Sequence, residues 1–142
     1  MGTSSYNDIF VGRFSAETAA QVETQVQRMI HYERDMTEAD TWLSNGIGIA
    51  RNEGAGGGHN GEADYVHMNL IRDTLLNFTY DVVTQRYDGN VPGIPNTTAA
   101  EISGDINGGS SIINFCNHGS VTGWSVAGYS ISHVNQLTNI GK

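Results

Sequence analysis

Cys116, the chain's only cysteine, lies two positions before His118 in the stretch INFCNHGSVTGW, residues 113–124. A thiol and an imidazole are the nucleophile and the acid–base group of thiol-dependent peptide cleavage. Cys116, however, closes the apolar run IINFC, and a lone cysteine in a buried strand is most often a small core hydrophobe. Two side chains of one short strand also leave no room between them for a scissile carbonyl. We therefore expect Cys116 to be structural and His118 to be the better candidate for chemistry.

Gly119 and Ser120 follow His118 at the point where the strand is expected to end. A glycine at this position lets the backbone of a substrate approach, and its N–H group can stabilise an oxyanion. Ser120 lacks the G-x-S-x-G context of a serine nucleophile. The alternative from spacing alone is that His118 is a turn histidine followed by a helpful glycine, and both interpretations stay open at this point.

A glycine-rich stretch, RNEGAGGGHNG (residues 51–61), offers a second chemistry. Gly56–Gly61 satisfies G-x-G-x-x-G between a predicted strand and a predicted helix, the context in which a pyrophosphate rests on a helix N-terminus. Asp88, after the next strand, could then face a ribose hydroxyl. Glu53 in the loop and Asp64 at the helix start place negative charge where a pyrophosphate would sit. Dinucleotide binding therefore remains the alternative function, and Asp64 could also simply complement the helix N-terminus.

The elements that must position these groups alternate between strand and helix, which predicts an α/β fold with a parallel sheet and flanking helices. In such sheets the functional loops leave the carboxyl ends of the strands. The loops 51–64 and 117–130 meet that condition. Ser15 and Ser132 are expected to begin the first and last helices. Strands are predicted at 7–14, 45–50, 80–87 and 109–117, and helices at 16–35, 62–78, 97–104 and 132–139.

Composition limits the classes of function that the chain can have. Its 142 residues have the size of one domain. The net charge of −8, from seven Lys and Arg against fifteen Asp and Glu, argues against a nucleic-acid partner. We expect no membrane span and no signal peptide in this sequence, because it has no long apolar stretch and no basic segment before an apolar core. The histidines do not have the spacing of zinc ligands.

Four segments in order along the chain resemble the arginine-specific gingipains of peptidase family C25: DIFVGRFSAET…TQVQRMIHYERD, IARNEG…HNGEADYVHMNLI, INFCNHGS…GW and SHVNQLTN. The resemblance covers nearly the whole chain. It implies a caspase-like fold, with a parallel α/β sheet and helices on both faces. It also implies a cysteine endopeptidase that cleaves after arginine or another basic P1 residue.

The resemblance assigns a role to each candidate residue. His118 matches the catalytic histidine of the family, and Gly119 matches the glycine whose N–H group helps to form the oxyanion hole. Glu53 matches the acid that orients the histidine, and Asp64 matches the acid at the base of the P1 pocket. A carboxylate that faces a guanidinium fork gives a physical reason for the preference for arginine.

The family's nucleophile lies in a later segment than any of these residues, and Cys116 matches a position that is not catalytic. The resemblance assigns residues 1–35 to the end of a first subdomain. It assigns residues 36–142 to the first half of the catalytic subdomain, without the nucleophile segment. We therefore expect this chain to be inactive alone, and a second chain carrying the cysteine is one expected partner.

The remaining expectations also come from the resemblance. The substrates would be peptides or proteins with a basic P1 residue, the chemistry would need no cofactor, and Ca²⁺ could be a structural ion. The protein would be secreted or located at the cell surface. A fragment that binds arginine-like ligands through Asp64 without turnover stays an alternative.

Overall fold

The computed structural model describes residues 12–56, 58 and 60–142. The chain divides into two compact units. One unit ends at Ala39 and also includes Gly141, and the other comprises Asp40–Ile140 and Lys142. The assignment of residues 1–35 to a family subdomain remains a prediction.

The helix of the first unit is α1 (Ala19–Ile30), which continues as the π-helical turn η1 (His31–Asp35). Thr18, not Ser15, is its N-cap, which corrects the predicted start. The Thr18 side chain accepts a hydrogen bond from the backbone of Gln21, whose side chain accepts one from the backbone of Thr18. A capping box typically has Gln or Glu three residues after the cap, and the residue in that position after Ser15 is Thr18. Of the strand predicted at 7–14, residues 7–11 lie outside the described residues, and 12–14 are not in a strand.

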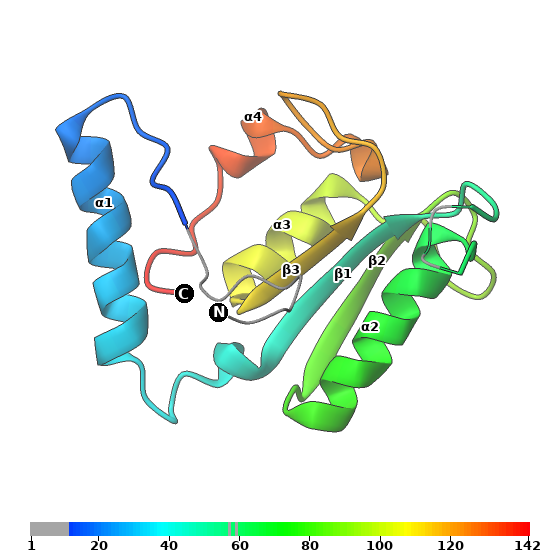
Figure 1. Cartoon of the computed structure of the whole chain (residues 1–142), viewed down its shortest axis with the longest axis horizontal. Coiled ribbons are helices and arrows are strands. Elements are labelled where there is room, and N and C mark those ends of the chain that lie inside the picture. Colours follow the sequence, from blue (N-terminus) through cyan, green and yellow to red (C-terminus); the bar gives the residue numbers. More distant parts are fainter. Residues whose placement is uncertain (1–11, 57, 59) are drawn as a thin grey trace, which may run out of the picture. The chain divides into compact units, whose positions relative to one another are not determined.

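The second unit contains a three-stranded sheet in the order β2-β1-β3, with both pairs of neighbours parallel (Figure 1). Its strands are β1 (Asn45–Arg51), β2 (Val82–Asp88) and β3 (Ile112–Cys116). The central β1 is buried from Gly46 to Ala50, as expected for a strand with a neighbour on each side and a covered surface above and below. A short 3₁₀ turn, η2 (Thr41–Ser44), leads into it. The predicted parallel α/β fold is confirmed.

One face of the sheet packs against α2 (Asp64–Phe78). Met68 of this helix is buried in a cluster with Ala50 and Tyr87 of the strands. Gly48 makes the close approach possible, because a Cβ atom there would lie 2.8 Å from Met68 Cγ. The fit of this face therefore depends on a missing side chain in β1.

The other face packs against α3 (Ala99–Gly108) and the 3₁₀ turn η3 (Val126–Gly128) (Figure 1). Strand periodicity sends alternate residues of β1 to opposite faces, so Ile47 and Ile49 lie on the side away from Met68. Each buried isoleucine of this kind contributes about 1.5–3 kcal/mol relative to an exposed one. The core on this face consists of Ile47, Ile49, Ile102, Ile106, Val126 and Tyr129.

The last helix, α4 (Ile131–Val134), is shorter than predicted and begins after Ser130 instead of Ser132. The Ser130 backbone N–H donates to His133 Nδ1 at 3.0 Å, and the His133 ring stacks on Tyr129. His133 is therefore a capping and packing residue. Within the described part of the chain, no helix is both long enough and apolar enough to cross a membrane.

Candidate active site

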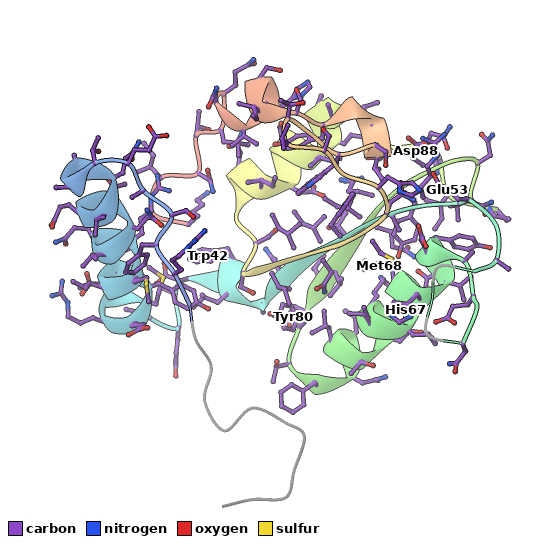
Figure 2. The ribbon with its side chains drawn as sticks, turned by 45° about the horizontal axis from the view of Figure 1, so that its top comes forward. Trp42, Glu53, His67, Met68, Tyr80 and Asp88 are labelled. Carbon is purple, nitrogen blue, oxygen red and sulfur yellow. The ribbon has the colours of Figure 1, made fainter. Side chains whose placement is uncertain are left out.

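The candidate residues gather at the carboxyl edge of the parallel sheet. Arg51, Asp88 and Cys116 are the last residues of β1, β2 and β3, and Arg51 pairs with Asp88 in the register. Glu53 follows β1 by two positions and His118 follows β3 by two. Figure 2 shows Glu53 and Asp88 together at this edge. The positions of Glu53 and His118 are therefore consistent with the prediction that the functional loops leave the carboxyl edge of the sheet.

His118 and Glu53 meet across the edge. His118 Nε2 lies 3.2 Å from Glu53 Oε2, and the His118 side chain is 82% exposed. The carboxylate can thus orient the ring through one nitrogen, while most of the imidazole stays open to solvent and to a ligand. The structure brings together two residues that lie 65 positions apart in the sequence.

A second charge contact holds the other oxygen of Glu53. Arg51 Nε lies 3.7 Å from Glu53 Oε1, and one terminal nitrogen of Arg51 lies 4.0 Å from Asp88 Oδ2. Asp88 in turn accepts a hydrogen bond from the Ala127 backbone N–H at 3.2 Å. Pairs this exposed contribute at most about 1 kcal/mol each. Their effect is geometric, since they fix Glu53 between a cation and the imidazole.

Asp64 is the first residue of α2, and its carboxylate reaches across to the loop after β3. Asn117 Nδ2 donates to Asp64 Oδ2 at 2.7 Å. The negative charge also complements the helix N-terminus, which is the simple structural role considered above. The contact with Asn117 goes beyond that role, because it directs the carboxylate toward the same edge as His118.

Cys116 differs from the expected core residue. It is half-buried, packs partly against the Met68 cluster and lines the pocket beside Asp64. Burial raises the pKa of its thiol, and the Asp64 charge, a hydrogen bond with Asp64 and the charge of Glu62 raise it further. A raised pKa disfavours the thiolate, which is the reactive form. The thiol thus shares the pocket with Asp64, whose charge raises its pKa, whereas the His118 ring contacts Glu53.

These side chains surround a pocket of about 410 Å³. Its walls bring together two carboxylates, an imidazole and an amide. The lining residues are Glu53, Gly54, Ala55, Gly56, Asp64, Cys116, Asn117 and His118. Gly119, the remaining predicted site residue, is exposed and lines a neighbouring hollow of about 310 Å³ that also includes His118, Trp124 and Tyr129.

Sequence reasoning missed two positions that hold the site. Asn117 lies between the two residues of the opening motif but was given no role, although its place at a strand end marks it as a residue of the functional edge. Arg51 closes β1 and could have been found in the same way. Their partners are far away in the sequence, so the contacts themselves need the fold.

The glycine loop uses its own backbone donors. Gly56 N–H donates to Gly61 O at 2.9 Å, and Gly58 N–H donates to Glu62 O at 2.8 Å. Asn60 N–H donates to Glu62 Oε2 at 2.7 Å. A pyrophosphate would need free donors of this kind, and here a carboxylate takes one of them. Gly57 and His59 of the predicted motif lie outside the described residues.

Metal ligation finds no support at these residues. The described ranges contain no group of three or more His, Cys, Asp or Glu side chains that could hold a metal ion. The structural calcium that the resemblance implied is therefore assigned to no residue here, and no chemistry is derived from it.

Fold and site define an α/β domain with an imidazole–carboxylate pair and a second carboxylate around one pocket, groups suited to acid–base chemistry on a cationic ligand. A profile of peptidase family C25 matches residues 1–142. The chain belongs to peptidase family C25, which confirms the family resemblance found in the sequence.

Two relatives from Porphyromonas gingivalis show the extent of the match. Gingipain R2 of strain ATCC 33277 and gingipain R1 are each 40% identical to this chain over 139 residues, 98% of its length. The chain spans 18% of that gingipain R2 and 13% of that gingipain R1. It is thus similar to a small part of each relative.

Solved structures agree with the sequence comparison. The crystal structure of the Arg-specific cysteine proteinase gingipain R (RgpB) matches with a TM-score of 0.83 at 40% identity. The match covers 98% of this chain and 31% of the gingipain R chain. A complex of the Porphyromonas gingivalis RgpB pro- and mature domains matches with a TM-score of 0.82, over 97% of this chain and 31% of that one.

Proposed function

We propose that these residues form the histidine-bearing part of a cysteine endopeptidase that cleaves after arginine or another basic residue. The observation that carries the proposal is the convergence of His118, Glu53 and Asp64 on one pocket at the carboxyl edge of the sheet. Family membership supplies the class of reaction. The names of the relatives support arginine as the P1 residue.

In the proposed reaction a thiolate from outside residues 1–142, in the same polypeptide or in a second chain, attacks the scissile carbonyl carbon. The new C–S bond forms as the carbonyl π electrons move to oxygen, and the Gly119 N–H group helps to hold that oxyanion. His118 then gives a proton to the amide nitrogen, the C–N bond breaks and the amine leaves. Water later hydrolyses the thioester and returns the thiol.

Glu53 and the ring of His118 divide the work on the proton. Because Nε2 faces the carboxylate at 3.2 Å, Nδ1 is the ring atom left to exchange a proton with the leaving amine. Glu53 acts as a positioning residue that holds this orientation. Arg51 supports it from the opposite side, with Nε 3.7 Å from Glu53 Oε1.

Asp64 is proposed to receive the P1 side chain. It is half-buried, lies in the same pocket as His118 and carries the charge that a guanidinium or an ammonium group requires. Family membership also underlies our further proposals: protein or peptide substrates, a secreted or cell-surface location and a structural calcium ion outside the site.

An activity assay of residues 1–142 alone tests whether the nucleophile comes from outside these residues. Residues 1–142 are expected to leave an arginyl fluorogenic peptide intact under reducing conditions, because their only thiol has a raised pKa. The measurement is fluorescence release against a buffer control. Robust turnover that requires reducing agent and disappears in Cys116→Ala would overturn the proposal.

A further inference from the structure

The side chain of Asn117 connects two parts of the site. Its Nδ2 donates to Asp64 Oδ2 at 2.7 Å, and its Oδ1 accepts a hydrogen bond from Ser125 Oγ. Asn117 and Ser125 are half-buried, and Asn117 lines the 410 Å³ pocket. The side chain thus joins the start of α2 to the loop after β3.

The chemistry of the partners fixes the direction of this amide. An ionised carboxylate only accepts hydrogen bonds, so the NH₂ group must face Asp64 and the carbonyl oxygen must face the Ser125 hydroxyl. The Ser125 backbone N–H donates to His118 O at 3.0 Å, which ties Ser125 to the same loop. Asn117 is therefore held in one orientation, and it already takes one of the two acceptor sites of Asp64 Oδ2.

Occupation of one carboxylate oxygen affects two cations differently. A guanidinium group binds a carboxylate best through two parallel N–H···O bonds, one to each oxygen. An ammonium group is a compact point charge that needs no such fork. The Asn117 amide competes with one arm of the fork. An ammonium group can still bind the other oxygen of Asp64 through a single hydrogen bond, so its binding geometry is unaffected.

We propose that Asn117 is a specificity-determining residue that reserves one oxygen of Asp64, so that the pocket takes a lysine-type ammonium about as well as an arginine-type guanidinium. This inference rests on the proposed function, in which Asp64 receives the P1 side chain. It deepens that function, because it states that the two basic side chains bind with comparable affinity.

The test compares the binding of Nα-acetyl-arginine amide and Nα-acetyl-lysine amide to residues 1–142 by titration of ¹H–¹⁵N spectra. The two Kd values are expected to lie within about threefold of each other. Asn117→Ala should shift the ratio toward arginine by about fivefold, because it releases the second oxygen. Ser125→Ala frees the amide and should shift the ratio in the same direction by a smaller factor. Asn135→Ala, which replaces an exposed asparagine directly after α4, should leave the ratio unchanged.

Two failures can be told apart. If Asp64→Asn binds both amides as well as the unsubstituted chain does, the P1 role of Asp64 is wrong. If Asp64→Asn abolishes binding but neither Asn117→Ala nor Ser125→Ala moves the ratio, only the present inference is overturned. A preference for arginine of about tenfold or more in the unsubstituted chain also overturns it. No binding of either amide would contradict both proposals. Should Asn117→Ala fail to fold, Ser125→Ala carries the same prediction.

Discussion

At the scale of single residues, the site depends on which carboxylate each reactive group meets. The His118 ring contacts the Glu53 carboxylate, whereas the charge of Asp64 acts on the Cys116 thiol and raises its pKa. Both reactive groups belong to one short motif, yet their environments differ because Cys116 closes a strand and His118 lies beyond it. The sequence was sufficient to prefer the histidine. It could not show that the thiol would be half-buried against a carboxylate, because that carboxylate comes from another element.

The raised pKa of Cys116 leads to a prediction about its reactivity. Replacing Asp64 with Asn removes the negative charge that, after burial, contributes most to the shift. The pKa of the thiol should therefore fall, and its alkylation by iodoacetamide at pH 7.5 should become faster by roughly threefold. Intact mass against time measures the rate.

Asp73→Asn is the matched control for this prediction, since Asp73 is 66% exposed. Its alkylation rate should equal that of the unsubstituted chain. An unchanged rate in Asp64→Asn would show that the carboxylate does not govern the thiol. The conclusion that Cys116 is a poor nucleophile would then rest on burial and the charge of Glu62.

At the scale of elements, sequence periodicity located the main strands and helices, but not their ends. β1 was predicted to within one residue because its apolar run is continuous. The starts of α1 and α4 were misplaced, although each begins after a residue that can cap. Thr18 and Ser130 are the N-caps because the side chains three residues later, Gln21 and His133, accept a hydrogen bond from the backbone N–H of the cap. Competition between neighbouring caps is decided by that reciprocal contact.

The packing of α2 on β1 gives a prediction about stability. Gly48→Ala places a methyl group 2.8 Å from Met68 Cγ in a buried cluster. Overpacking should outweigh the smaller backbone entropy of alanine, with a net loss of about 1–2 kcal/mol in the free energy of unfolding. Urea denaturation monitored by circular dichroism measures it.

Gly104→Ala provides the comparison for Gly48→Ala. Gly104 lies inside α3, and a Cβ atom there meets nothing within 4 Å. Alanine should leave stability unchanged or raise it by about 0.5–1 kcal/mol. If both substitutions behaved alike, the close approach of α2 would not be the reason for glycine at position 48.

At the scale of the whole molecule, every candidate site residue belongs to the unit Asp40–Ile140 with Lys142. The core of that unit also consists of residues from within it, from Ile47 to Tyr129. A chain of residues 40–142 is therefore expected to fold and to keep the pocket. Amide chemical shifts of Glu53, Asp64 and His118 that match those of the longer chain would confirm this. A collapsed spectrum would contradict it.

The chain matches only part of the length of its relatives. The chain covers 31% of the gingipain R structure that it matches, so that proteinase is larger than the chain described here. The family was predictable from the sequence because four matching segments follow one another in the family's order. The parallel sheet was predictable because strands and helices alternate. The contacts of Asn117 and Arg51 were not, because they join residues from different strands and loops.

The strand order has a consequence for how such a site is completed. Among the strands described, β3 lies at one border of the sheet, with β1 on its inner side only. Its outward main-chain groups are a template on which another extended segment can hydrogen-bond. A segment that adds there in parallel would finish beside the imidazole, on the side opposite Glu53's strand. Catalytic assembly would then be a matter of sheet extension, with backbone pairing setting the reach of the incoming sulfur.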